Sequence, residues 1–277
     1  MRLPFSGLLS RRSFLTLIGA AAIAATGCGP APAAELPPRE RFHLFLLVGQ
    51  SNMAGRGKVE AQDKKPHPRV LTFSKGREWV PAVDPIHFDK SSAGVGLGRT
   101  FAIELAEANP DITIGLIPCA VGGSPIESWE PGALDTATKT HPWDDAMARC
   151  ELALRAGTLK GILWHQGESD ANAARAPLYE KRLHSLIDRF RTTLKAPDVP
   201  FIAGQMGQFA GKPWSDEMKR VDAIHRALPK SMENTAFVSA EGLKDKGDLI
   251  HFDAESYREL GRRYAAAYRK LNEAARK

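Results

Sequence analysis

The sequence predicts one three-layer α/β/α domain built around a parallel sheet, and three observations lead to this fold class. Several short runs are apolar throughout instead of alternating, which is typical of strands buried on both faces of a sheet. Amphipathic helical patterns separate these runs, as expected for the crossover connections between parallel strands. The chain shows no internal repeat and no second linker after residue 41. We therefore expect a single domain over residues 42–277.

The N-terminal segment is predicted to be an export signal over residues 1–33. A basic start with the pair Arg11-Arg12 precedes Phe14-Leu15 and an apolar run that continues to Ala25. This order is typical of a signal sequence, and the paired arginines resemble the twin-arginine type. The apolar run is too short to cross a bilayer, which takes about 20 apolar residues.

Two endings of this signal remain open. Cys28 follows Ala25-Thr26-Gly27, which resembles a lipoprotein box and would leave Cys28 lipidated, whereas Ala31-Pro32-Ala33 suits ordinary cleavage. Residues 34–41 then form a Pro-rich linker. We expect an exported bacterial protein that is either periplasmic or held at the membrane only through a lipid on Cys28.

Five apolar runs after the linker are predicted to be strands, with helices between most of them. The strands are expected at 42–48, 112–118, 161–164, 201–204 and 236–239, and the helices at 98–108, 143–156, 177–194, 214–227 and 254–271. Asn109-Pro110 ends the first helix, Pro177 suits the first turn of the third, and Asp253 is placed to cap the last. Apolar residues recur at helical spacing on the third and last helices.

Composition and charge exclude several classes of function. The 277 residues are 43% hydrophobic and 25% charged, which is typical of a globular protein and not of a disordered chain or a coiled coil. Removal of the predicted signal, which carries three arginines, lowers the formal net charge from +6 to +3. The remaining Lys and Arg are interspersed with acids, so we expect no nucleic-acid partner. Cys119 and Cys150 are expected to be buried free thiols.

Four polar, glycine-containing segments follow the predicted strands. They are residues 49–57, 119–129, 165–170 and 247–253. Ligands of such sheets bind beyond the carboxyl ends of the strands. We therefore expect the four segments to converge on one edge of the sheet and to carry the chemistry.

Ser51, Asp248 and His251 are the candidate catalytic residues in these segments. A Ser hydroxyl is a weak nucleophile until a base takes its proton, and the imidazole of His251 titrates in a range that suits such a base. Asp248 lies three residues before His251 and can orient the imidazole if the segment turns. Donors for an oxyanion are the backbone N–H of Ser51, an N–H in the Gly122-Gly123 turn and the side-chain amide of Gln166.

The neighbouring polar residues have less specific expected roles. Glu168 is expected to hold the surrounding loops by accepting backbone N–H bonds, and Asp170 to be a solvated loop acid or a helix cap. Four further residues are expected to border the cleft: Trp79, Asp84, His87 and Asp89.

Together, the four segments resemble the SGNH-type hydrolases, in particular the group of sialate O-acetylesterases and carbohydrate esterase family six. The resemblance runs from about Phe45 to Tyr268. Its motifs are Gly-Gln-Ser-Asn-Met at 49–53, Gly-Gly-Ser-Pro-Ile-Glu-Ser-Trp at 122–129, Trp-His-Gln-Gly-Glu-Ser-Asp at 164–170 and Asp-Leu-Ile-His-Phe-Asp at 248–253. It implies a flavodoxin-like sheet of about five parallel strands, and metal-independent removal of acetyl groups from an acetylated carbohydrate without a cofactor.

The resemblance also implies roles for single residues. Ser51 is the implied nucleophile with Asp248 and His251 as its partners, and Gly123 and Gln166 are implied oxyanion donors beside Ser51. Supporting roles are expected for Gln50, Asn52, Gly122 and Glu168. The family contains enzymes that act on acetylated xylan and enzymes that act on O-acetyl sialate, so acetylxylan or a related glycan is the expected substrate and sialate is the alternative.

Two interpretations from other classes remain. A metal-dependent hydrolase would use ligands from one acidic and histidine-containing set: His165, Glu168, Asp170, His251 and Asp253. No recognisable zinc spacing links these residues. A non-catalytic, glycan-binding surface lipoprotein would instead use Trp129, Trp143 and Trp214 as stacking platforms.

Overall fold

The computed structural model describes residues 36–274, which fold around one sheet of seven strands. The strands are β1 (Phe42–Gly49), β2 (Val70–Phe73), β3 (Trp79–Pro81), β4 (Thr113–Pro118), β5 (Thr158–His165), β6 (Phe201–Gly204) and β7 (Thr235–Val238). Their order across the sheet is β3-β2-β4-β1-β5-β6-β7. All neighbouring strands are parallel except β2 and β3.

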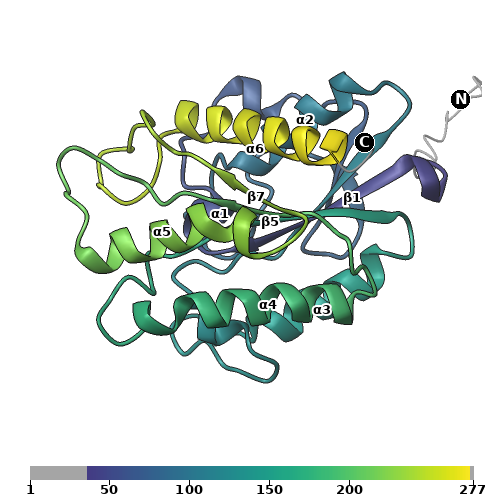
Figure 1. Ribbon diagram of the computed structural model, residues 1–277. Helices are drawn as coiled ribbons and strands as arrows, with labels where there is room; N and C mark the ends of the chain where they lie inside the picture. Colours follow the sequence, from purple (N-terminus) through teal and green to yellow (C-terminus); the bar gives the residue numbers. More distant parts are fainter. Residues whose placement is uncertain (1–35, 275–277) are drawn as a thin grey trace, which may run out of the picture. The chain divides into compact units, whose positions relative to one another are not determined.

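Helices cover both faces of this sheet (Figure 1). On one face lie α3 (Pro142–Ala153), α4 (Tyr179–Thr193) and α5 (Asp216–Ser231), whose apolar residues share one core cluster. On the other face, α2 (Leu97–Ala108) and α6 (Ala254–Ala274) pack into a second cluster. The predicted three-layer α/β/α architecture is therefore confirmed, and each predicted helix is present within a few residues of its expected bounds.

The expected number of strands was too low. The five predicted strands are β1, β4, β5, β6 and β7, but the sheet continues past β4 with β2 and the antiparallel β3. These two strands have four and three residues, and β3 ends in Pro81. Segments this short carry no readable periodicity, and Pro occurs mainly at sheet edges. The periodicity of the sequence therefore does not predict the β2–β3 hairpin, which joins the sheet because β2 pairs with β4.

Burial of the central strand explains its sequence. In β1 every residue except His43 is buried, because helices cover both faces. On the α6 face, Tyr257, Leu260 and Tyr264 are fully buried and lie at helical spacing. Burial of one such side chain stabilises a fold by roughly 1.5–3 kcal/mol. The predicted cap of α6 is also confirmed, since Asp253 Oδ1 accepts the N–H of Ser256 at 2.7 Å.

The chain that leads into β1 is attached to the domain at its last residues. Arg39 begins a short 3-10 helix (Arg39–Arg41), and its guanidinium donates to the carbonyl of Leu154 at 2.7 Å. The predicted signal at 1–33 and the candidate lipidation site Cys28 lie outside the described residues. Within residues 36–274, no helix has the length and the apolar character needed to cross a membrane.

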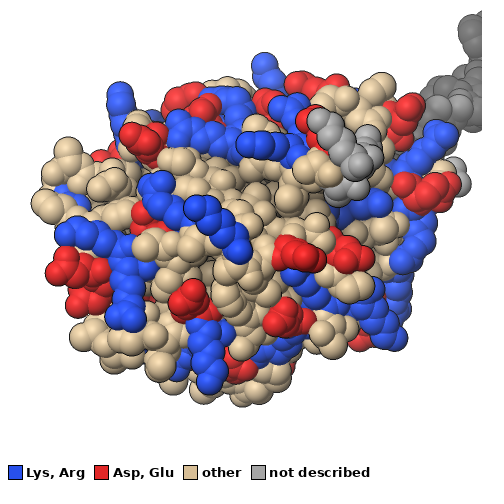
Figure 2. Space-filling model, in the orientation of Figure 1, with Lys and Arg blue, Asp and Glu red and all other residues tan. Residues whose placement is uncertain are grey.

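Charge and thiol chemistry also agree with expectation. Lys and Arg are interspersed with Asp and Glu on the face shown in Figure 2, and no continuous basic stripe crosses that face. Cys119 and Cys150 are buried free thiols, as predicted. Burial raises the pKa of Cys119 to about 12, so this thiol stays protonated and unreactive at neutral pH.

Candidate active site

A cavity of about 680 Å³ opens at the carboxyl ends of the central strands. Its walls come from the segments after β1, β3, β4, β5 and β6 and from the loop that precedes α6. The connection after β1 runs toward the β3 edge of the sheet, whereas the connection after the neighbouring β5 runs toward the β7 edge. Such a switch point is the usual ligand site of an open parallel sheet, and the four predicted segments do meet there.

Ser51 is presented to this cavity by a sharp turn at the end of β1. Gly49 has a φ of 126°, and a Cβ at this position would lie 2.2 Å from the carbonyl oxygen of His165. Only glycine permits this approach, which lets the N–H of Gln50 donate to that carbonyl at 2.9 Å. The chain then begins α1 (Ser51–Ala54), so Ser51 stands at the start of a helix and lines the cavity.

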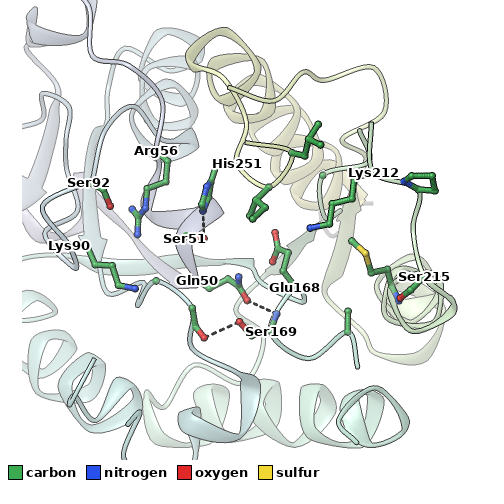
Figure 3. A pocket seen from close by; sticks show the side chains of 18 residues that line it. Gln50, Ser51, Arg56, Lys90, Ser92, Glu168, Ser169, Lys212, Ser215 and His251 are labelled. Carbon is green, nitrogen blue, oxygen red and sulfur yellow. Dashed lines mark hydrogen bonds between the residues drawn. The ribbon is translucent and has the colours of Figure 1, made fainter. Parts of the chain in front are cut away.

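Ser51, His251 and Asp248 form one hydrogen-bonded row. Nε2 of His251 lies 2.9 Å from Oγ of Ser51, and Nδ1 of the same ring lies 2.7 Å from Oδ2 of Asp248. The dashed line in Figure 3 marks the contact between Ser51 and His251. Because a carboxylate accepts the Nδ1 proton, Nε2 is left as the acceptor for the Ser51 hydroxyl. The structure thus brings together side chains that are 200 positions apart.

Asp248 is held in its ionised form. Burial alone would raise the pKa of its carboxyl, but several hydrogen bonds outweigh that effect and lower the pKa. The donors are the backbone N–H groups of His251 and Ile250, the imidazole of His251 and the ammonium of Lys246, which lies 2.9 Å from Oδ2. A fixed negative charge beside Nδ1 stabilises a positively charged imidazole.

Two backbone donors face the cavity close to Ser51. Within the described residues, neither the N–H of Ser51 nor that of Gly123 has an acceptor. The N–H of Gly122 is already used, since it donates to Oδ2 of Asp89 at 3.0 Å. Asp89 is fixed in turn by Arg56, with 2.6 Å between Nη2 and Oδ2. This leaves Gly123, and not Gly122, with a donor available to a bound molecule.

The position of Gln166 differs from the prediction that its side-chain amide is an oxyanion donor. Its side chain is fully buried and does not line the cavity. The amide nitrogen donates to the carbonyl of Ser124 at 3.2 Å and to Oδ2 of Asp170 at 2.5 Å, and its oxygen accepts from Tyr179 at 2.8 Å. Because both N–H groups are engaged below the loop, Gln166 is not placed as an oxyanion donor. It instead supports the loop that carries Gly123.

Asn52 connects the helix of Ser51 to the loop of His251. Its amide donates to Oε1 of Glu168 at 2.6 Å and to the carbonyl of Ile250 at 3.0 Å, and its oxygen accepts from the hydroxyl of Tyr257 at 2.6 Å. Burial raises the pKa of Glu168, although Asn52 and the nearby His251 and Lys212 oppose this shift. Glu168 therefore joins two segments as expected, and it does so through the side-chain amide of Asn52.

Gln50 and Ser169 connect the remaining two segments. The N–H of Ser169 donates to the side-chain oxygen of Gln50 at 3.3 Å, and its hydroxyl donates to the carbonyl of Gly123 at 2.9 Å. Both contacts are drawn in Figure 3. Of the predicted supporting residues, Gln50 and Asn52 flank Ser51 in the chain, and Gly122 and Glu168 line the same cavity.

Other predicted residues lie elsewhere. Asp170 is fully buried and accepts the N–H of Ile126 at 2.8 Å, so the expectation of a solvated acid was wrong and that of a cap is closer. Asp89 borders the cavity through Arg56 and Gly122, and His87 lines a separate cavity. Trp79 and Asp84 line neither of these two cavities.

The structure also bears on the two other interpretations, a metal-dependent hydrolase and a non-catalytic glycan-binding protein. Among the described residues, no group of three or more His, Cys, Asp or Glu side chains is arranged to hold a metal ion. Trp129 is fully buried and Trp143 nearly so, and both pack in the core instead of presenting a stacking platform. The indole of Trp214 is held by a hydrogen bond to the carbonyl of Gly207.

Several residues at the site were not found from the sequence. Lys246 contacts Asp248, and Tyr257 was assigned only to the apolar stripe of its helix. Lys90 and Lys212 line the cavity from opposite sides in Figure 3. Isolated lysines in polar loops give no local signal of a shared site. For the contact between Lys246 and Asp248, the short distance of two positions in the sequence was the one available signal.

Comparisons with known proteins agree with this geometry. Residues 41–270 match the family described as carbohydrate esterase, sialic acid-specific acetylesterase. A probable carbohydrate esterase of Arabidopsis thaliana is 31% identical over 254 residues, covering 84% of this chain and 91% of that protein. The crystal structure of this plant protein superposes with a TM-score of 0.73 and covers 84% of this chain and 99% of that one.

Two more distant structures share the fold. NanS is 16% identical, covers 86% of this chain and all of its own (100%), and has a TM-score of 0.67. A carbohydrate acetylesterase from Xanthomonas citri is 20% identical with a TM-score of 0.66, covering 83% of this chain and 57% of that one.

Proposed function

Because the chain belongs to the carbohydrate esterase family of sialic acid-specific acetylesterases, we propose that it removes O-acetyl groups from carbohydrates through an acyl-enzyme on Ser51. Carboxylic ester hydrolysis follows from the family. The roles of the three side chains rest on the row formed by Ser51, His251 and Asp248. The distances of 2.9 Å and 2.7 Å within this row are the observation that carries the proposal.

In the first half-reaction, Oγ of Ser51 attacks the acetyl carbonyl while Nε2 of His251 takes its proton. The negative charge that develops on the carbonyl oxygen is stabilised by the N–H groups of Ser51 and Gly123. His251 then gives its proton to the sugar oxygen, the C–O bond to the sugar breaks, and the acetyl group stays on Ser51. Asp248 keeps the ring oriented and stabilises its positive charge throughout.

In the second half-reaction, water takes the place of the sugar. Nε2 of His251 removes a proton from this water, which attacks the acetyl-Ser51 carbonyl and forms a second tetrahedral intermediate. The same two N–H groups bind its oxyanion. His251 returns the proton to Oγ of Ser51, and acetate leaves.

Replacement of the nucleophile tests this mechanism directly. We expect Ser51→Ala to lower kcat for acetate release by several orders of magnitude, because members of such a triad act as a unit. Ser91→Ala is the matched control, since Ser91 is exposed and does not line the cavity. Mass spectrometry of quenched wild-type enzyme should find one acetyl group on Ser51. Wild-type rates in the Ser51→Ala protein would overturn the mechanism.

The sugar that carries the acetyl group is a separate question. We propose acetylxylan or a related acetylated glycan, with O-acetyl sialate as the second candidate. O-acetyl sialate is kept as the second candidate because of the family description and of two ammonium groups, of Lys90 and Lys212, at the cavity. Acetate release from acetylated xylan, acetylated mannan and O-acetyl sialic acid decides between them through the highest kcat/KM.

We further propose that the mature enzyme acts outside the cytoplasm. This proposal rests on the Arg11-Arg12 pair and the apolar run that follows it. Replacement of both arginines by lysine should leave the protein in the cytoplasmic fraction. Cys28→Ala should release it from the membrane fraction if Cys28 is lipidated, and should change nothing if cleavage follows Ala33.

A further inference from the structure

A second cavity of about 370 Å³ lies beside the first. The two cavities share two chain segments as a common wall. Asp89 lines the second cavity and Lys90 the first, while Cys119–Val121 line the second and Gly122 with Gly123 line the first. The two cavities are therefore adjacent, which is the arrangement that one carbohydrate of several sugars needs in order to occupy both. None of the catalytic residues proposed above lines the second cavity.

The second cavity contains a buried cation without an anionic partner. Arg149 of α3 is only 8% exposed and lines the cavity. Its Nη2 donates to the backbone carbonyls of Phe73 at 2.5 Å and Ser74 at 3.0 Å, and its guanidinium lies over the rings of Phe73 and Phe88. Within residues 36–274, no carboxylate forms an ion pair with Arg149. A buried charge is costly unless it is paired, so a ligand anion would complete this site.

The charges around Arg149 favour the same kind of ligand. Lys75 and Arg77 are exposed side chains that line the same cavity. Two acids also line it, but Asp89 is neutralised by Arg56 at 2.6 Å. The other, Asp145, is exposed and accepts the backbone N–H of His141 at 3.2 Å. The cavity therefore keeps an excess of positive charge.

The remaining lining suits a sugar ring. Phe88 is 37% exposed and offers an apolar surface beside the guanidinium of Arg149. Thr138 and Thr140 also line this cavity, where their hydroxyl groups are hydrogen-bonded to each other and that of Thr138 to Asp135. An apolar surface with a few convergent polar groups is the usual composition of a small-molecule site. Nη2 of Arg149 already donates to two carbonyls and Nε is buried, so the N–H groups of Nη1 are those left for a carboxylate oxygen.

We propose that the second cavity binds a carboxylate-bearing sugar, a uronate, of the same glycan whose acetyl group lies at Ser51. The link to acetyl removal rests on the proposed function, whereas the carboxylate site itself does not. Arg149 binds the carboxylate, Lys75 and Arg77 attract it from the rim, and Phe88 contacts the ring. The enzyme then prefers acetylated glycans that carry uronic acid, either as a branch on a neutral chain or within the chain itself.

Calorimetric titration with unacetylated oligosaccharides tests this site. The probes are xylotetraose with one glucuronic acid branch, plain xylotetraose and trigalacturonate. We expect at least one uronate probe to bind about tenfold more tightly than plain xylotetraose, and this difference to shrink as salt screens the charges. A preference for the branched probe indicates a uronate branch, and a preference for trigalacturonate indicates a uronate in the chain.

Variants assign the difference to the second cavity. Arg149→Met should abolish the difference in affinity between the uronate probes and plain xylotetraose. Because Arg149 is buried, its replacement can also disturb the core. The exposed pair Lys75→Ala/Arg77→Ala therefore gives an independent test that does not depend on core packing. Lys181→Ala/Lys230→Ala removes the same charge from α4 and α5, away from both cavities, and should preserve the preference. Equal affinity for all probes, or a preference that survives Arg149→Met and the Lys75/Arg77 pair, would overturn the proposal.

The same titration separates this proposal from the esterase mechanism. Ser51→Ala should bind the uronate probes as tightly as the wild type, because Ser51 does not line the second cavity. A failure of the acyl-enzyme mechanism therefore leaves the binding result unchanged. A failure of uronate binding in turn leaves acetate release by Ser51 unaffected.

Discussion

Gln166 offers the sharpest test of how the cavity is built. The sequence assigns its amide to the oxyanion hole, whereas the structure places it below the Gly123 loop. Gln166→Met keeps nearly the same length and volume but removes both the donors and the acceptor. If the structure is right, the loss appears mainly in the stability of the fold. If the amide binds the oxyanion, the loss appears mainly in kcat.

The expected stability loss follows from the three hydrogen bonds. The carbonyl of Ser124 is left buried without its side-chain donor, which costs about 1–3 kcal/mol. Asp170 keeps the N–H of Ile126, and Tyr179 keeps its contact with His225 at 2.9 Å, so each of these loses one of several bonds, at about 0.5–1.5 kcal/mol. The free energy of unfolding should therefore fall by about 2–6 kcal/mol.

Urea denaturation and steady-state kinetics measure the two quantities separately. We expect kcat of the folded Gln166→Met protein to fall by less than about tenfold, whereas loss of an oxyanion donor costs about 10²–10³. Gln205→Met is the matched control, because Gln205 is buried and accepts from Ala240 and Ser239 outside the cavity. Wild-type stability combined with a kcat lowered 10²-fold or more would refute the positional role and restore the donor role.

Three further outcomes follow from the site and its supports. Asp248→Asn should lower kcat by about 10⁴, because the imidazole of His251 loses the partner that fixes its tautomer, and a rate above one tenth of the wild type would contradict this role. Gly49→Ala should destabilise the fold by about 2–5 kcal/mol in denaturant titrations, since the new Cβ meets the carbonyl of His165 in a backbone conformation that L-residues rarely adopt. Burial, with help from a nearby acid, raises the pKa of Asp84 to about 7, so this carboxyl contributes stability that is complete below about pH 4 and is lost as the pH rises through 7. Asp84→Asn should flatten that part of the stability profile, and an unchanged slope would show that Asp84 does not titrate there.

Much of the site could be predicted because its four segments have the same local sequence pattern. Each of the four segments combines glycine with polar residues, and three of them come directly after an apolar run. In a parallel sheet such runs end at one edge, which places Ser51 there, whereas His251 reaches Ser51 through the long loop between β7 and α6. Gly49 and Gly123 also belong to these segments, and both adopt positive φ values that favour glycine.

The predictions that were wrong concern residues whose role depends on the direction in which the side chain points. Gln166 and Glu168 are two positions apart in the same segment, yet the first points below the loop and the second into the cavity. Asp170, expected as a solvated acid or a helix cap, is buried and accepts the N–H of Ile126. No pattern in the sequence specifies which side of a loop a polar side chain takes, because that choice is made by partners from other parts of the chain.

The sequence by itself determined the α/β/α layers, the strands β1, β4, β5, β6 and β7, and the polar segments that follow the strands. These features could be predicted because periodicity and turn chemistry are local properties. The tertiary structure alone decided the edge hairpin β2–β3, the burial of Gln166 and the cavity around Arg149. These features depend on contacts between segments far apart in the chain. That the buried guanidinium of Arg149 forms no ion pair within residues 36–274 is visible only once α3 is packed against the loops after β2 and β4.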